Sequence, residues 1–153
     1  MGVCFMFYKY NPMLSTEHFH PMLVHFPIAL VMIGFLADLA SLLIKKEICF
    51  PKISFYLLIL GTLGAFAAVL SGLIFTNEMS GAAGEVRETH ELLAFATVLV
   101  LTVTSILRII LLRKPDNKGL KRLAFILYAV AAVCVSLTGA LGGTLVYNYM
   151  MPL

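Results

Sequence analysis

Long runs of apolar residues dominate the chain, and short polar segments separate them. The apolar runs cover approximately residues 21–44, 53–76, 90–112 and 120–150. A helix of roughly 20 apolar residues crosses the hydrocarbon core of a bilayer, which is about 30 Å thick. The pattern therefore predicts a transmembrane helix in each run. The last run is the longest and contains Gly139, Gly142 and Gly143, where we expect the helix to tilt or kink.

Short connections between the runs determine the expected arrangement of the helices. Segments such as KKEICFPK and RKPDNKGLKR are too short to cross the bundle, so consecutive helices are expected to be antiparallel neighbours. The predicted fold class is an all-α integral membrane protein, an antiparallel four-helix transmembrane bundle. Its predicted parts are an N-terminal outer segment, residues 1–20, and a four-helix domain, residues 21–150.

Composition supports a membrane protein and excludes several other classes. The chain is 61% hydrophobic and 12% charged, about half the charged fraction of a soluble domain, and its mean hydropathy is +0.98. Its net charge of +3 comes with no basic patch, so no nucleic-acid partner is expected. The cysteines are Cys4, Cys49 and Cys134, whose spacing matches no zinc or covalent haem motif.

Basic residues predict the orientation of the chain in its membrane. The connections after the first and third runs, with the span ends beside them, carry most of these residues: Lys45, Lys46, Lys52, Arg108, Arg113, Lys114, Lys118, Lys121 and Arg122. The opposite side carries only Lys9 and Arg87. Positive residues stay cytoplasmic. We therefore expect both termini to lie outside, in the periplasm, with the protein in a bacterial inner membrane.

All the histidines lie on the predicted outer side. His18, His20 and His25 surround the start of the first run, and His90 opens the third. One interpretation is a b-type haem near the outer face, since histidines from two helices can bind haem iron from opposite sides. We expect His25 and His90 to be these axial ligands, because both lie inside predicted helices. Such a protein would transfer single electrons.

The remaining members of the predicted haem site surround this histidine pair. His20 would bond a propionate, a water molecule or the second nitrogen of a ligand. The other expected cofactor-binding residues are Arg87, Gly139, Gly143 and Tyr147. The glycines leave room for a flat cofactor, or they simply allow close helix packing. Whether His20 or His25 points inward stays open, because helix phase measured from Asp38 favours His20.

Two further interpretations of the histidines stand beside haem. A transition metal ion such as zinc, copper or iron would take imidazole and carboxylate ligands. The candidate ligands are His18, His20, His25, His90 and Glu91. Alternatively, the histidines cap or anchor helices in a structural or partner-binding subunit. Motifs for hydrolase or transferase chemistry are missing, which favours cofactor binding over enzyme activity.

Asp38 and Arg108 are charged residues inside predicted spans, where unpaired charge is rare. They lie at similar depths in the first and third spans. We therefore predict a structural ion pair between them. His90 and Arg108 are five helical turns apart, so the two side chains share one face of the third span.

Two motifs, HPMLVHFPIAL and GALGGTLVYNYM, resemble those of a bacterial family of predicted four-span membrane proteins, number 2231 in the domain-of-unknown-function series. The matching positions are His20, Pro21, Val24, His25, Phe26, Pro27, Asp38, His90, Gly142, Gly143, Leu145, Val146 and Tyr147. The resemblance covers the chain after its first sixteen residues and implies the four-helix fold and a histidine site. Some relatives are fused to Rieske iron–sulfur domains, which implies a redox setting. The expected partners are the lipid bilayer and a Rieske-type protein, another redox protein or a quinone; a homo-oligomer stays open.

Overall fold

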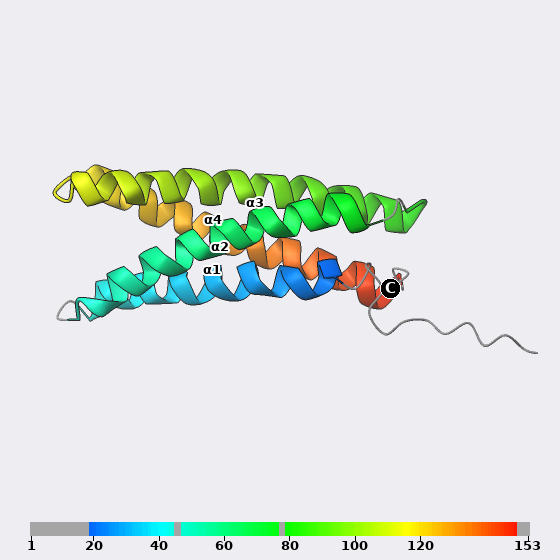
Figure 1. The fold of residues 1–153 in the computed structure, drawn as a ribbon, viewed down its shortest axis with the longest axis horizontal. Helices are drawn as coiled ribbons and strands as arrows, with labels where there is room; N and C mark the ends of the chain where they lie inside the picture. Colours follow the sequence, from blue (N-terminus) through cyan, green and yellow to red (C-terminus); the bar gives the residue numbers. More distant parts are fainter. Residues whose placement is uncertain (1–18, 45–46, 77–78, 150–153) are drawn as a thin grey trace, which may run out of the picture.

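The computed structural model describes residues 19–44, 47–76 and 79–149, and nearly all of them are helical (Figure 1). The helices are α1 (Phe19–Leu43), α2 (Cys49–Phe75), α3 (Ala82–Arg113) and α4 (Lys118–Asn148). Each is long and apolar enough to cross a membrane. Consecutive helices run antiparallel, so the predicted fold class, an all-α bundle with four candidate membrane spans, is confirmed for this part of the chain.

All four helices begin earlier than their apolar runs, and the difference is largest for α3. α3 starts at Ala82 rather than near residue 90, because most of residues 82–89 are good helix formers, although the segment is too polar for hydrocarbon. The good helix formers are Ala82, Ala83, Glu85, Arg87 and Glu88. α1 starts at Phe19, two residues before the predicted run at 21–44, so His20 and Pro21 both lie within the helix. Pro21 lies in the first turn, where its missing N–H leaves no hydrogen bond unmade. His20 therefore has a helical backbone and a defined direction.

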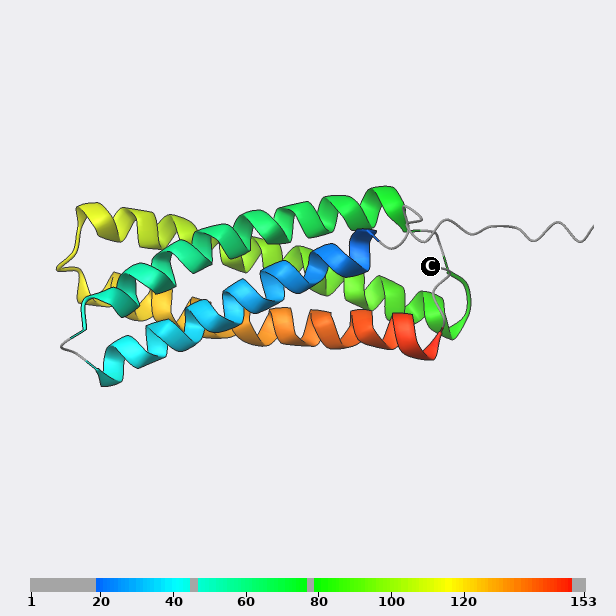
Figure 2. The same cartoon turned by 60° about the horizontal axis from the view of Figure 1, so that its bottom comes forward.

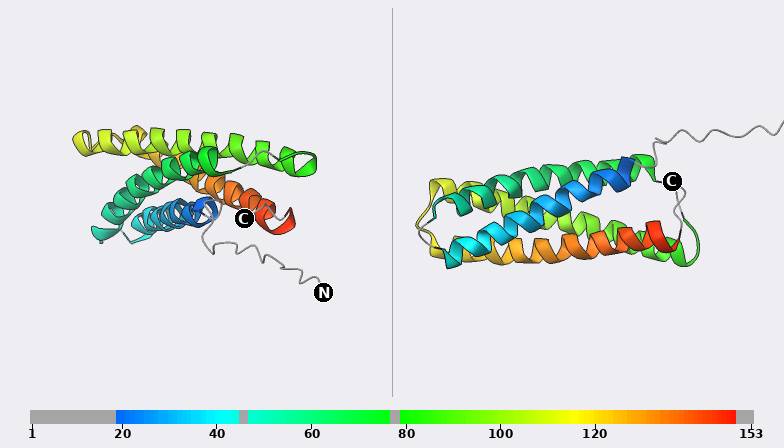
Figure 3. Two further views of the ribbon diagram at one scale, coloured as in Figure 1. Left: turned by 45° about the vertical axis from the view of Figure 1, so that its right-hand side comes forward. Right: turned by 90° about the horizontal axis from the view of Figure 1, so that it is seen from below.

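The bundle has two chemically different ends. At one end α1 and α3 begin and α2 and α4 finish; we call this the histidine end, because His20, His25 and His90 lie there. At the other end α1 and α3 finish and α2 and α4 begin; we call this the basic end, because it carries Arg113, Lys114, Lys118, Lys121 and Arg122. Figures 2 and 3 show the bundle from further sides, with the last described residues of α4 at the histidine end.

Interior and lipid-facing residues separate cleanly around each helix. The core contains large side chains that are fully buried, namely Val31, Leu58, Leu101 and Tyr128, with small residues between them. The outer surface carries exposed leucine, isoleucine and phenylalanine side chains along all four helices. In lipid, apolar groups gain little from leaving the solvent, so close packing and hydrogen bonds must hold the helices together. The buried bond between the hydroxyls of Thr62 and Ser105, 2.8 Å long, joins α2 to α3 in this way.

The two helical hairpins, α1–α2 and α3–α4, are equivalent halves. Several buried residues of the first hairpin have a buried counterpart 70 positions later in the second hairpin. Examples of equivalent buried pairs are Pro27 and Thr97, Val31 and Leu101, Leu58 and Tyr128, and Ala65 and Val135. α1 also packs on α4, and α2 on α3. The hairpins thus surround the bundle axis with an approximate two-fold arrangement, in which α1 and α3 lie diagonally opposite each other.

Candidate cofactor site

A cavity of about 300 Å³ lies at the histidine end, between all four helices. It is partly open to the surroundings, and most of its lining is apolar. Its polar lining residues are His20, His25, Thr76, Arg87, His90, Glu91, Thr97, Thr138 and Tyr147. An apolar cavity with a few convergent polar groups is the usual form of a ligand site.

His20 enters the cavity from α1, held by a hydrogen bond to α2. Its Nδ1 lies 2.8 Å from Oγ of Ser71. The Ser71 hydroxyl donates its single proton to the carbonyl of Ala68, so it accepts from Nδ1–H of the histidine. The proton of the neutral ring is therefore on Nδ1, and Nε2 keeps a free lone pair.

His90 repeats this arrangement from α3. Its Nδ1 lies 3.0 Å from the backbone carbonyl of Thr138 on α4. A carbonyl only accepts, so Nδ1 of His90 is again the protonated nitrogen and Nε2 again keeps its lone pair. A second bond that fixes the ring through Nδ1 is typical of histidines that bind metals. The hydroxyls of Thr97 and Thr138, 3.2 Å apart, further join α3 to α4 beside this ring.

The two rings meet across the bundle, although they come from diagonally opposite helices. The centroids of the His20 and His90 rings are 6.4 Å apart and the ring planes are nearly perpendicular, at 87°. A metal–nitrogen bond is about 2 Å long, and the centroid of the imidazole ring lies about 1 Å behind the nitrogen. Two imidazoles on opposite sides of one metal ion would therefore have centroids about 6 Å apart. Two imidazoles at a tetrahedral angle would have centroids about 5 Å apart. The observed centroid separation is closer to the first value than to the second.

His25, which we expected to pair with His90, has a different position. It lines the cavity, but its side chain is exposed and its Nδ1 bonds the carbonyl of Pro21 at 2.6 Å. Five residues separate His20 from His25, a rotation of about 140° around the helix. Once α1 begins at Phe19 and His20 faces inward, His25 cannot. The ring beside that of His90 is therefore His20, while His25 lines the cavity without contacting His90.

The other predicted cofactor-binding residues lie around the same cavity. Arg87 and Glu91 are half-buried on α3 and flank His90, whereas Tyr147 is exposed at its rim. A Cβ built on Gly139 would approach Cδ1 of Ile28 at 3.0 Å, so this glycine allows close packing. A Cβ on Gly143 would meet nothing within 4 Å, so this glycine leaves open space.

The predicted bare-metal site is only partly represented in the structure. His18 lies outside the described residues. Among residues 19–44, 47–76 and 79–149, no group of three or more histidine, cysteine, aspartate or glutamate side chains is arranged to hold a metal ion. The described part of the chain brings together one imidazole pair, His20 and His90.

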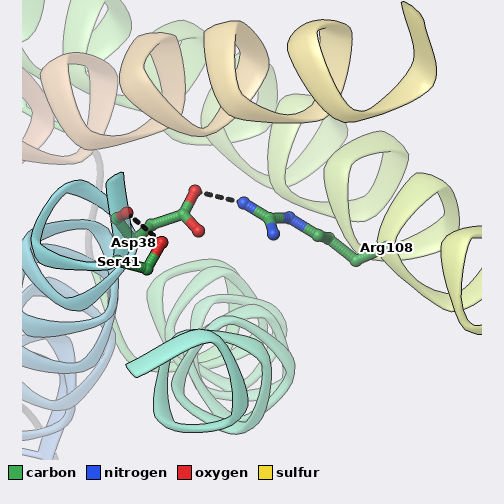
Figure 4. A network of polar contacts seen from close by, with 3 residues as sticks. All are labelled: Asp38, Ser41 and Arg108. Carbon is green, nitrogen blue, oxygen red and sulfur yellow. Dashed lines mark hydrogen bonds and ion pairs between the residues drawn. The ribbon is translucent and has the colours of Figure 1, made fainter. Parts of the chain in front are cut away.

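At the basic end, the predicted ion pair is formed. Arg108 donates a hydrogen bond from Nη2 to Oδ2 of Asp38, and the carboxylate is almost fully buried (Figure 4). Ser41, drawn beside it, bonds the backbone carbonyl of Asp38 rather than its side chain. Each histidine lies five turns from a charged residue on its own helix, His20 from Asp38 and His90 from Arg108. On α1, His20 and Asp38 therefore lie on one face, and on α3, His90 and Arg108 lie on one face. These two faces make both the histidine contact and the ion pair.

The roles of several residues in these contacts were missed from the sequence, although Gly142 was named there as a kink point and a motif position. Ser71 and Thr138 anchor the histidine rings, while Gly72 and Gly142 make room for them. Serine, threonine and glycine are common inside membrane helices, so their presence alone signals nothing. The spacing of 70 residues that relates His20 to His90 and Gly72 to Gly142 is the signal that could have found the glycines.

Comparison with known families agrees with the extent of the fold. A family model described as "Predicted membrane protein (DUF2231)" matches residues 16–152. The matched range includes all four helices and every residue that lines the cavity. No curated protein and no solved structure matches the chain significantly.

Proposed function

Since the chain belongs to the predicted membrane protein family DUF2231, whose description gives no activity, we propose a function from its own residues: it binds one b-type haem between His20 and His90 and carries single electrons. The proposal rests on one observation. Two imidazoles, each anchored through Nδ1, have ring centroids 6.4 Å apart, close to the separation expected for two ligands of one metal ion.

The walls of the cavity suit a flat, apolar cofactor. Gly72, Gly139, Gly142 and Gly143 line two sides, and aliphatic side chains cover much of the rest. The volume is at the lower end of the range for ligand pockets, about 300–1,000 Å³. A porphyrin would therefore fill the cavity and extend through its open side. Arg87, half-buried at the same level as His90, is suitable for binding a propionate.

The protein residues would control position and exposure at this site. When bound, a haem with two histidine ligands supplies reversible uptake of one electron. Ser71 and Thr138 hold the two imidazoles in the tautomer that presents Nε2, and the apolar walls limit water near the rings. Electrons would pass to or from a separate partner, either a redox protein such as a Rieske protein or a quinone in the bilayer.

We further propose that the histidine end faces the periplasm of a bacterial inner membrane. Basic residues gather at the opposite end, and positive residues remain on the cytoplasmic side. Cysteine variants Ser80→Cys and Asn117→Cys, in a background without the native cysteines, test the orientation. An impermeant thiol reagent added to intact cells should label the first and spare the second. Labelling of Asn117→Cys alone would reverse the proposed orientation.

Visible spectroscopy of the purified protein tests haem binding. We expect a Soret band and sharp bands on reduction, with one haem per chain by pyridine extraction. His20→Ala and His90→Ala should each lose these bands, because each removes one axial ligand. His25→Ala is the matched control and should keep them, because His25 is not directed at His90.

Two outcomes would overturn the proposal. A protein that is colourless as purified, and that takes up no haem on reconstitution, would not be a haem protein. A haem spectrum that survives His20→Ala and disappears in His25→Ala would replace the assigned ligand. Elemental analysis of the same samples would reveal zinc, copper or iron bound without porphyrin.

A further inference from the structure

A second polar cluster lies near the basic end, far from the histidines. Each helix contributes one residue: Asp38 from α1, Ser54 from α2, Arg108 from α3 and Tyr128 from α4. Ser54 lies close to the Asp38 carboxylate, and the Tyr128 hydroxyl lies beside Gly34, one turn before Asp38 on α1. Figure 4 shows the charged pair at the centre, between the ribbons of the surrounding helices. We call these four residues the polar cluster.

The polar cluster is buried but incompletely hydrogen-bonded. Tyr128 is 0% exposed and Ser54 is 1% exposed. The Tyr128 hydroxyl and Nε of Arg108 have no hydrogen-bond partner within the described residues. Oγ of Ser54 lies within reach of the Asp38 carboxylate, to which it can donate its proton, and its lone pairs then remain free to accept. The Tyr128 hydroxyl occupies the position that a Cβ on Gly34 would take, one turn before Asp38 on α1. The unpartnered groups thus converge on the same part of the interior as the carboxylate.

The chemistry of these groups defines what would satisfy them. A buried hydroxyl without a partner costs several kcal/mol in an apolar medium, and lipid offers no replacement. Asp38 and Arg108 cancel each other's charge, so a neutral ligand is favoured over an ion. The ligand must accept from Nε of Arg108 and both accept from and donate to hydroxyls. A water molecule, which makes about three hydrogen bonds when buried, has these properties.

We propose that the polar cluster is a binding site for an ordered internal water molecule, which links all four helices near the basic end. This water would bond Ser54 of α2, in the first hairpin, and Tyr128 of α4, in the second, and so connect the two hairpins. Together with the ion pair, they fix the rotation of α1 and α3 about their own axes. The site is independent of any cofactor at the histidine end.

Thermal unfolding of the full chain in detergent is the first test. Tyr128→Phe removes only the hydroxyl and should lower Tm by several degrees, because the bound water loses a partner. Tyr56→Phe is the matched control: Tyr56 is exposed on α2, and its variant should keep the parental Tm. If the Tyr128 hydroxyl has no partner, its removal leaves Tm unchanged or raises it, and the proposal fails.

Direct detection of the water supplies a second test that does not depend on stability. Solid-state NMR of tyrosine-labelled protein in lipid should show rapid magnetisation transfer from water to the Tyr128 ring carbon that bears the hydroxyl. Ser54→Ala should slow this transfer while the fold is kept. A Tyr128 signal without transfer in the parental protein would overturn the proposal. If Tm rises with added chloride but not with added gluconate, the polar cluster binds an anion and not a water molecule, and the proposal fails.

Discussion

Gly72 and Gly142 occupy equivalent positions on α2 and α4, and each lies against the ring of a different histidine. A Cβ built on Gly72 would approach Cε1 of His20 at 3.0 Å, and one on Gly142 would approach Cε1 of His90 at 3.2 Å. Both contacts are tighter than ordinary van der Waals contact. Each hairpin therefore holds its histidine against its own second helix, and the two-fold arrangement brings the rings together on the bundle axis.

Alanine substitutions at these glycines should separate close contact from helix propensity. We expect Gly72→Ala and Gly142→Ala each to destabilise the protein by about 1–3 kcal/mol, because the new methyl group crowds a histidine ring. Gly143→Ala should be neutral or stabilising by up to about 1 kcal/mol, since its Cβ meets open space and alanine favours helix. Unfolding curves in detergent measure all three. Equal effects at the three positions would show that ring contacts are unimportant.

A larger side chain at Gly143 should block the cavity without breaking the fold. Gly143→Leu places a branched side chain in the open space beside the histidines, so we expect loss of haem uptake with an unchanged helical circular dichroism spectrum. Ala140→Leu, on the exposed side of the same helix, is the matched control and should bind haem normally. Normal haem uptake by Gly143→Leu would place the cofactor elsewhere.

The ion pair should tolerate exchange of its two charges better than loss of either. Asp38→Arg and Arg108→Asp each place two like charges together in the interior, and we expect each to cost about 3–5 kcal/mol or to prevent folding. The double variant D38R/R108D restores opposite charges at equivalent positions of the two hairpins, and much of the stability should return. Yield of monodisperse protein and Tm measure the recovery. A double variant no better than the single variants would show that the hairpins are not interchangeable here.

Gly34 and Tyr128 should be energetically coupled. A methyl group at Gly34 would overlap the Tyr128 hydroxyl and approach Cβ of Leu57 at 3.0 Å. We therefore expect Gly34→Ala to destabilise the parental protein by about 1–3 kcal/mol, and by clearly less in a Tyr128→Phe background. A double-mutant cycle of Tm values tests this coupling. Additive effects would mean that the Leu57 contact, not the hydroxyl, accounts for the cost.

Much of the architecture could be predicted from hydrophobic pattern, because lipid allows few alternatives to a helix of sufficient length. The Asp38–Arg108 contact could be predicted too, since an isolated charge in a span is costly and the residues lie at similar depths. The histidine that lies beside His90 could not be predicted in this way. That choice depended on whether α1 begins at Phe19 or at Pro21, because only a helical backbone at His20 directs its side chain to the same face as Asp38.

The sequence by itself determined that four helices are long and apolar enough to cross a membrane, that basic residues gather at one end and that the histidines gather at the other. These properties follow from local composition and from the fixed rise of a helix. Only the tertiary structure decided that His20 faces His90, that Ser71 and Thr138 orient the rings, and that Ser54 and Tyr128 join the ion pair. Those contacts link residues 16 to 90 positions apart, and they depend on how each helix is rotated against its neighbours. Close packing between the helices sets that rotation, and a pattern of apolar residues specifies it only approximately.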